Sequence, residues 1–410
     1  MNPQVILYTI VIIILLNYIL ERWLSWLNNK NSSEILPDEL KGIYEEEKYK
    51  KQRAYDKAKD KFSIISSTFS LLLLLILFFF KGFAIIDEVA KSLTTNYLLL
   101  PLVFFGILLF ASDIINIPFS LYSTFVIEER FGFNRTTFKT YLLDKLKGAI
   151  VGVILGGGLL ILFSWFYNYM GELFWLWTWG AFSVVMILMT MFYASVIVPL
   201  FNKLTPLADG ELKEEITNYC KKVGFKLDNL FVMDGSKRSS KANAFFSGLG
   251  AKKRIVLYDT LTNEYSKEEI TAVLAHEIGH FKKKHTLTAI VISILQVGLM
   301  LFILSLVINK PEFSMALGVQ EKSFPISLLV FSFLYTPLSL LIGILMNVIS
   351  RKNEYEADNY AKTTYQAAPL VNALKKLSVD SLSNLTPHPY AVFINYSHPT
   401  LLQRIKALYK

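Results

Sequence analysis

The sequence predicts a mainly α-helical, polytopic membrane protein that also carries a small cytoplasmic α+β domain. Hydrophobic residues make up 53% of the chain and the mean hydropathy is +0.41, which is too apolar for a soluble protein of this size. The apolar residues gather in long blocks with few charges, as membrane-crossing helices require. One polar segment, residues 203–285, interrupts these blocks and predicts the cytoplasmic domain.

Seven apolar blocks are long enough to cross the hydrocarbon layer, which needs about 20 helical residues. They lie near residues 5–20, 63–80, 97–126, 148–169, 174–200, 287–308 and 324–350. The chain is thus expected to comprise an N-terminal membrane region with five spans (1–202), the polar domain (203–285), two further spans (286–350) and a C-terminal cytoplasmic segment (351–410).

Positive charge is distributed unevenly along the chain. Of the 42 lysine and arginine residues, 38 lie in segments 21–62, 127–147, 203–285 and 351–410. Cytoplasmic loops are enriched in these residues, so the four segments are predicted to be cytoplasmic. The net charge of +9 then follows from topology and indicates no nucleic-acid partner.

The polar domain shows the patterns of both helix and strand. Residues Gly210–Lys222 predict an amphipathic helix. Two extended apolar runs, Ala242–Ser247 and Arg254–Asp259, predict a β-hairpin. The residues that join these runs include Gly248, Gly250 and Lys252.

A helix after this hairpin carries the run His276-Glu277-Ile278-Gly279-His280. The run Ser266-Lys267-Glu268-Glu269 has the pattern of a capping box and predicts where the helix begins. Histidines four residues apart share one helix face, where they can bind one zinc ion while Glu277 faces the water to be activated. The pattern indicates a zinc-dependent peptidase; the alternative is an exposed, charged helix turn without a metal.

Zinc in a catalytic site needs a third protein ligand. The run Glu354-Tyr355-Glu356-Ala357-Asp358 is the expected source, because it offers several carboxylates on a later element. The single cysteine, Cys220, excludes a cysteine-based zinc cluster.

Asn243 is a polar residue among the apolar residues of the first hairpin strand. Peptidases of this kind commonly hold substrate as an added strand at a sheet edge, so Asn243 could bond the backbone of a bound peptide. The alternative is an ordinary hairpin asparagine.

Asp113 and Asn116 lie inside the third apolar block. An ionisable group facing lipid is unfavourable, so both are predicted to face a wet interior. A polar contact between helices is the alternative.

Several motifs together resemble one family, the type I CaaX prenyl endopeptidases. They are Glu129–Asn134, Gly235–Ser240 through Asn243, Arg254–Leu261, the run His276–His280, Ser350–Asp358 and Ser397-His398-Pro399. The resemblance covers most of residues 120–410, and the order of the motifs makes it more specific than any one of them.

The resemblance implies a role for each matching residue. It implies that His276, His280 and Glu354 bind one zinc ion per chain and that Glu277 is the general base. Asp358 would be a catalytic or supporting carboxylate one helical turn from Glu354. Asn243 and His398 would lie against the bound peptide, and His398 could also donate to the developing oxyanion.

The resemblance also implies a fold and a substrate. Family members resemble a barrel of seven tilted helices around a chamber in the membrane, and they release the last three residues of a protein after a prenylated cysteine. The expected partners are therefore a peptide or protein substrate, such as a prenylated CaaX protein, and the lipid bilayer. The expected location is the endoplasmic reticulum membrane in a eukaryote or the inner membrane in a bacterium.

Two residues near these motifs are predicted to have no role at the metal. Glu356 follows Glu354 by two positions, so on a helix it points about 200° away and is expected to be a solvated surface charge. His285 follows three lysines and is expected to lie at the membrane interface.

Three alternatives share part of the pattern. A site-2-type intramembrane protease would bury the zinc motif within an apolar span, whereas here Lys282, Lys283 and Lys284 follow it. A membrane quality-control protease of the HtpX type would be shorter, with about four spans. A seven-helix transporter or receptor with a structural zinc would need no general base.

Overall fold

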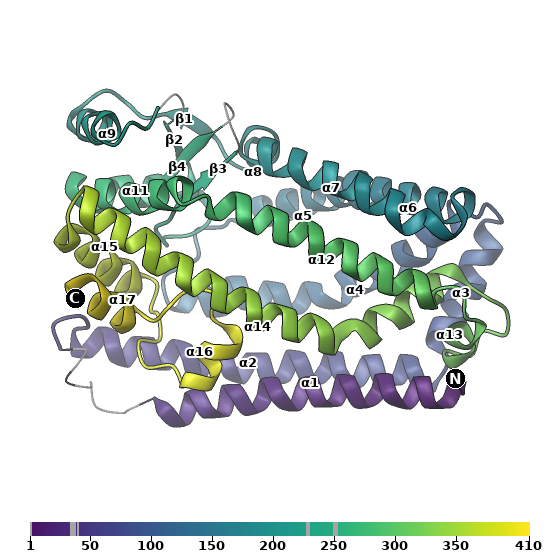
Figure 1. The fold of residues 1–410 in the computed structure, drawn as a ribbon. Helices are drawn as coiled ribbons and strands as arrows, with labels where there is room; N and C mark the ends of the chain where they lie inside the picture. The colour runs from purple at the N-terminus through teal and green to yellow at the C-terminus, as the bar shows by residue number, and fades with distance from the viewer. Residues whose placement is uncertain (1, 33–37, 39–40, 227–229, 249–252) are drawn as a thin grey trace.

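The structure is a computed structural model of the 410-residue chain and describes all residues except 1, 33–37, 39–40, 227–229 and 249–252. Long helices lie side by side, and a small sheet with several shorter helices covers one end of them (Figure 1). Among the described residues, seven helical runs are long and apolar enough to cross a membrane, which confirms the seven predicted spans. The two chain ends lie at opposite ends of the bundle, as an odd number of spans requires (Figure 1).

Several spanning runs contain π-helical turns, which are labelled η2, η3 and η5. The runs are α1 (Pro3–Asn31), α2 (Glu46–Phe79), α4 with η2 (Leu100–Tyr122, Ser123–Glu128), α5 with η3 and α6 (Phe138–Gly152, Val153–Gly157, Gly158–Tyr169), η4 with α7, η5 and α8 (Gly171–Leu173, Phe174–Phe192, Tyr193–Ile197, Val198–Phe201), α12 (His285–Val307) and α14 (Phe324–Thr364). The other helices are α3 (Gly82–Leu93), α9 (Glu211–Lys222), η6 (Gly235–Lys237), α10 (Asp259–Glu264), α11 (Lys267–Lys282), α13 (Pro311–Ala316), α15 (Ala367–Asp380), α16 (Pro389–Asn395) and α17 (Leu401–Tyr409).

The sheet has four strands in the order β1-β2-β4-β3, and their bounds are β1 (Leu204–Pro206), β2 (Leu230–Met233), β3 (Ala244–Ser247) and β4 (Arg254–Tyr258). Strands β3 and β4 pair antiparallel, which confirms the predicted hairpin, although Gly250 and Lys252 of its connection lie outside the described residues. The predicted amphipathic helix is α9. The sequence did not predict β1 and β2, since runs of three and four residues are too short to show an alternating pattern.

Helix α14 has 41 residues and is therefore about 60 Å long, twice the thickness of the hydrocarbon layer of about 30 Å. Its first part spans the membrane and its last part extends beyond it. Residues near the end of α14, such as Ala361, are buried in the core of the polar domain. One continuous helix thus connects the membrane bundle to that domain.

Helix α11 lies at the centre of the polar domain. Ten of its 16 residues are buried, and they occupy most positions from Glu269 to Gly279. Its core partners come from several other elements and include Ile216 of α9, Leu257 of β4, Leu370 of α15 and Leu408 of α17. A helix that is buried on most of its surface is held in a fixed position.

The orientation of the bundle can be tested with single cysteines in a Cys220→Ala background. Lys310 and Lys406 are exposed and the Lys213 side chain is 43% exposed, so these three serve as labelling positions. We expect cysteines at 213 and 406 to react with a membrane-impermeant reagent from the cytoplasmic side, and a cysteine at 310 to react only from the opposite side. Labelling of positions 310 and 406 from the same side would contradict the seven-span topology.

Candidate active site

The predicted capping box fixes the beginning of α11. The Ser266 hydroxyl accepts a hydrogen bond from the Glu269 amide at 3.2 Å, and the Ser266 amide donates to the Glu269 carboxylate at 3.0 Å. Lys376 of α15 donates to the same carboxylate at 2.7 Å. The buried helix that follows presents His276 and His280 on one face.

Helices α11 and α14 approach each other closely at Gly279 and Ala357. A Cβ atom at position 279 would lie 3.1 Å from both the Cα and the carbonyl oxygen of Ala357, which is tighter than an ordinary contact. The absence of a side chain at Gly279 therefore allows this approach. It brings the last part of α14, with Glu354 and Asp358, against the two histidines.

Three predicted ligands form one cluster. The His276 and His280 Nε2 atoms are 3.1 Å apart, and each lies close to the Glu354 carboxylate, at 3.4 Å from His276 Nε2 to Oε2 and 3.3 Å from His280 Nε2 to Oε1. His276 and Glu354 are buried, and His280 is half-buried. The structure therefore brings together residues that are 78 positions apart in the sequence.

The cluster fits a tetrahedral zinc ion. Zinc bonds of about 2.0–2.1 Å separate two ligands by about 3.3 Å in a tetrahedron, close to the separations observed here. The buried Oε2 atom of Glu354 has no hydrogen-bond partner among the described residues, which a buried carboxylate oxygen tolerates poorly. A cation bound by this oxygen would satisfy it, and two imidazoles with one carboxylate are a donor set that zinc accepts.

Asp358 and Arg404 form a second layer behind His276. The Asp358 Oδ1 atom lies 2.9 Å from His276 Nδ1, which confirms that this carboxylate shares the face of Glu354. Arg404 of α17 donates two hydrogen bonds to Asp358, at 2.9 Å and 2.6 Å, and its guanidinium lies 3.5 Å from Glu354. All three charged side chains are buried.

Arg404 was not predicted from the sequence. A signal was present, since Leu401, Arg404 and Leu408 occupy one face of a helix and all three are buried. A lone arginine between two leucines on the buried face indicates a buried partner. Its position alone did not identify that partner, because Asp358 is 46 residues earlier.

Burial and neighbouring charges shift the pKa values of two residues in α11. Burial alone lowers the pKa of His276, but the nearby carboxylates of Asp358 and Glu354 outweigh this effect and raise the pKa to about 9. Metal binding at this histidine therefore displaces a proton. Burial raises the pKa of the Glu277 carboxyl above its ordinary value.

Two neighbouring residues make contacts that were not predicted from the sequence. His285 begins α12 and is buried, and its Nδ1 atom lies 3.0 Å from His280 Nδ1. The partly exposed Glu356 carboxylate lies 3.2 Å from His285 Nε2. The helical geometry that directs Glu356 away from the metal cluster leaves it free to contact a residue on the next helix.

The two predicted peptide-binding residues lie on different elements. The His398 side chain is 63% exposed, its Nε2 atom lies 3.4 Å from Glu354 Oε1, and its Nδ1 atom is 2.9 Å from the Ser397 hydroxyl. Asn243 is exposed and directly precedes β3, which forms one edge of the sheet. The apolar side chains of Ala244 and Phe246 in β3 pack against the core that contains α11.

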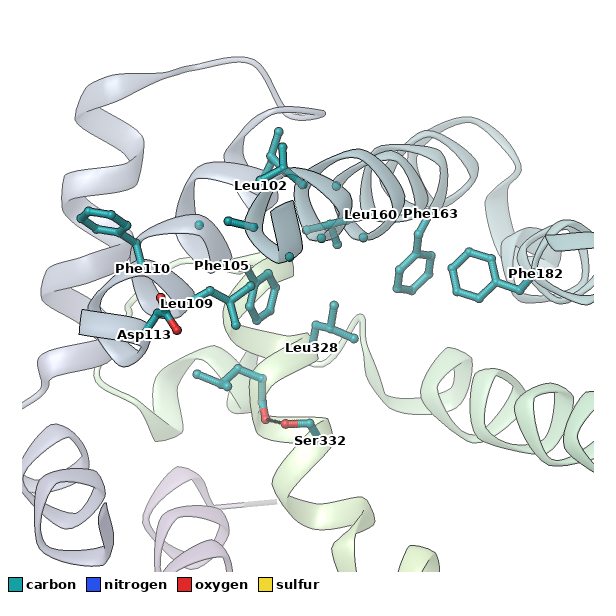
Figure 2. A pocket seen from close by; sticks show the side chains of 18 of the residues that line it. Leu102, Phe105, Leu109, Phe110, Asp113, Leu160, Phe163, Phe182, Leu328 and Ser332 are labelled. Carbon is teal, nitrogen blue, oxygen red and sulfur yellow. Dashed lines mark hydrogen bonds between the residues drawn. The ribbon is translucent and has the colours of Figure 1, made fainter. Parts of the chain in front are cut away.

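A cavity of about 1240 Å³ lies among the membrane helices α4, α5, α6, α7, α12 and α14. Figure 2 shows mainly apolar side chains around it, such as Phe105, Leu160 and Leu328. Asp113 also lines the cavity and pairs with Lys145 of α5, which is a polar contact between helices, the alternative considered for this residue. Asn116 does not line this cavity; its amide donates to the Ser112 carbonyl at 2.8 Å.

These features define an integral-membrane metallopeptidase, with its site where the helix of the two histidines meets the end of a membrane helix. Comparison with protein families supports this class. Residues 25–203 match the family model described as "CAAX prenyl protease N-terminal, five membrane helices", and residues 206–410 match "Peptidase family M48". The chain belongs to peptidase family M48.

Similar proteins come from several eukaryotes. CAAX prenyl protease 1 of Saccharomyces cerevisiae is 38% identical over 95% of this chain and 92% of its own length. The human CAAX prenyl protease 1 homolog is 33% identical over 91% of this chain and 88% of its own length. The crystal structure of S. mikatae Ste24p superposes with a TM-score of 0.93 at 36% identity and covers 100% of both chains.

The third ligand can be tested by removing one carboxylate. We expect purified wild-type protein to hold one zinc ion per chain and Glu354→Ala to lose most of it, because two histidines do not complete the ligand set. Metal content measured by atomic emission, with folding checked by thermal unfolding, tests this. Full zinc occupancy in a folded Glu354→Ala variant would show that another residue is the ligand.

Proposed function

We propose that this chain is a zinc endopeptidase that removes the C-terminal three residues of prenylated CaaX proteins at the cytoplasmic side of a membrane. The observation that carries the proposal is the metal-sized cluster of His276, His280 and Glu354 with Glu277 beside it on the same helix. The names of the relatives support the CaaX substrate. The concentration of lysine and arginine in the segments around the cluster supports the orientation.

The proposed chemistry needs a metal, a base and a proton donor. Zinc held by the three ligands would polarise the scissile carbonyl and lower the pKa of a water molecule beside it. Glu277 accepts a proton from the attacking water through its carboxylate. It then transfers that proton to the nitrogen of the leaving amine as the carbon–nitrogen bond breaks. The raised pKa of Glu277 favours the first step, since it makes this carboxylate a stronger base.

Asn243 and His398 are proposed to hold the peptide on either side of this centre. The edge strand β3 can accept the substrate as an additional strand, and the exposed carboxamide of Asn243 can bond its backbone. His398 can donate from Nε2 to the carbonyl oxygen as it becomes negative, provided that its Nδ1 atom accepts a hydrogen bond from Ser397. Its exposure leaves it accessible to substrate.

The N-terminal half favours this function over a quality-control protease of the HtpX type. The five helices of residues 25–203 match a model that is described for CAAX prenyl proteases. Membership of a peptidase family also argues against a transporter or receptor with a structural zinc.

The role of the base can be separated from metal binding. We expect Glu277→Gln to abolish cleavage of a farnesylated CaaX peptide but to retain zinc and fold, because all three ligands remain. Released tripeptide and bound zinc are measured on the same preparation. Cleavage by a zinc-loaded Glu277→Gln variant at more than a few per cent of the wild-type rate would exclude Glu277 as the base.

Catalysis and substrate binding should respond to different substitutions. We expect His398→Ala to lower kcat by about 100-fold, which is typical for loss of an oxyanion donor. Asn243→Ala should mainly raise KM, because a backbone contact is present in both the bound substrate and the transition state. Steady-state kinetics with prenylated and unprenylated peptides measure both effects, and a zinc-loaded His398→Ala variant with unchanged kcat would remove that residue from the mechanism.

A further inference from the structure

The two histidines of the cluster have different partners on the side away from the metal position. His276 Nδ1 lies 2.9 Å from the Asp358 carboxylate. His280 Nδ1 instead lies 3.0 Å from the Nδ1 atom of His285, whose Nε2 atom lies 3.2 Å from the Oε2 atom of Glu356. His280 is therefore connected to a carboxylate through a second imidazole.

The backbone explains why His280 is connected to Glu356 only through His285. Glu356 follows Glu354 by two positions on α14, so it faces away from the metal cluster. His285 is the first residue of α12, and Lys284 before it adopts a left-handed conformation with φ of +61°. This conformation is unfavourable for a residue with a side chain. The strained turn directs the next helix so that His285 enters the space between His280 and Glu356.

The contacts fix one arrangement of protons. His280 must present an unprotonated Nε2 atom to bind a metal, so its proton is on Nδ1 and is donated to His285. His285 Nδ1 then accepts, and its own proton is on Nε2, from which it donates to Glu356. Both imidazoles are neutral in this arrangement. The position of the proton in the bond between His280 and His285 sets its position in the bond between His285 and Glu356.

The burial of His285 and the exposure of Glu356 indicate that the contact between them is specific. His285 follows three exposed lysines at the end of α11, yet only 7% of its own surface is exposed. The Glu356 side chain is 39% exposed, and its other nearby charge, Lys352, lies 3.9 Å away. Glu356 thus retains its hydrogen bond to a buried imidazole although its charge could be fully solvated.

We propose that His285 and Glu356 are positioning residues that hold His280 in the orientation and tautomer needed to bind the catalytic metal. The proposal rests on the metal-binding role proposed above for His280. Hydrogen-bond partners behind a ligand histidine typically change metal affinity or activity by about 10–100-fold. Substitution of either residue should therefore change the zinc affinity directly, and the chemical step only as a consequence.

The test measures zinc affinity of the full-length protein by competition with a chelator. We expect His285→Ala and Glu356→Ala each to weaken zinc binding by about 10–100-fold. His285→Asn should recover part of the loss, since its side-chain oxygen can accept from His280 Nδ1 but cannot reach Glu356. In a His285→Ala background, Glu356→Ala should have no further effect, because the bridge is already broken.

Two controls distinguish positioning from a general loss of stability. Lys352→Ala removes the other charge near Glu356 and should leave zinc affinity at the wild-type value. The visible absorption of the cobalt-substituted protein should change in His285→Ala and not in Lys352→Ala, because it reports the geometry of the ligands. A lowered Tm with unchanged zinc affinity and an unchanged cobalt spectrum would overturn the proposal.

The variant His280→Ala separates this proposal from the proposed function. If His280→Ala keeps its zinc, the metal site itself is assigned incorrectly. If His280→Ala loses zinc while His285→Ala and Glu356→Ala bind it as tightly as wild type, the metal site stands and the positioning role is excluded.

Discussion

The close approach of α11 and α14 at Gly279 is the constraint on which the site depends. His276 and His280 flank Gly279 at three positions before and one after, and Glu354 and Asp358 flank Ala357 in the same way. One point of helix contact therefore places two histidines opposite two carboxylates. A Cβ atom at Gly279 would contact Ala357 more closely than ordinary packing allows, so the helices would have to move apart. Displacements well below 1 Å matter for residues that must converge on one ion. The buried core around α11 keeps this contact fixed.

Charge balance explains why the second layer contains an arginine. Glu354 and Asp358 are buried together, and two carboxylates without cations are strongly unfavourable in a protein interior. Arg404 neutralises one of them through two hydrogen bonds to Asp358. The Glu354 Oε2 atom has no hydrogen-bond partner among the described residues and lies 3.4 Å from His276 Nε2, so its negative charge remains available to a metal ion. Helix α17 thus supplies the positive charge that balances the buried carboxylates.

The sequence predicted those features that are written in local patterns. Hydropathy predicted all seven spans, and the capping box and the spacing of His276 and His280 predicted α11 and its polar face. The features it missed depend on contacts between distant segments. Strand β1 forms because it pairs with β2, and β2 forms because it also pairs with β4. The link from His280 through His285 to Glu356 depends on the turn between α11 and α12 and on the position of α14. Helical geometry directs Glu356 away from the metal cluster, but it gave no information about its partner on another helix.

The position of the site at the end of the membrane bundle reconciles two opposite requirements. Hydrolysis needs water and charged groups, which are unfavourable in hydrocarbon, whereas the outer surfaces of the spans are apolar, with exposed residues such as Leu146 and Leu345. Helix α14 resolves this conflict because it is long enough to cross the membrane and then to carry Glu354 and Asp358 into the polar domain. The cavity among the spans contains both apolar side chains and the Asp113–Lys145 ion pair, so its wall combines surfaces suited to an apolar group and to water.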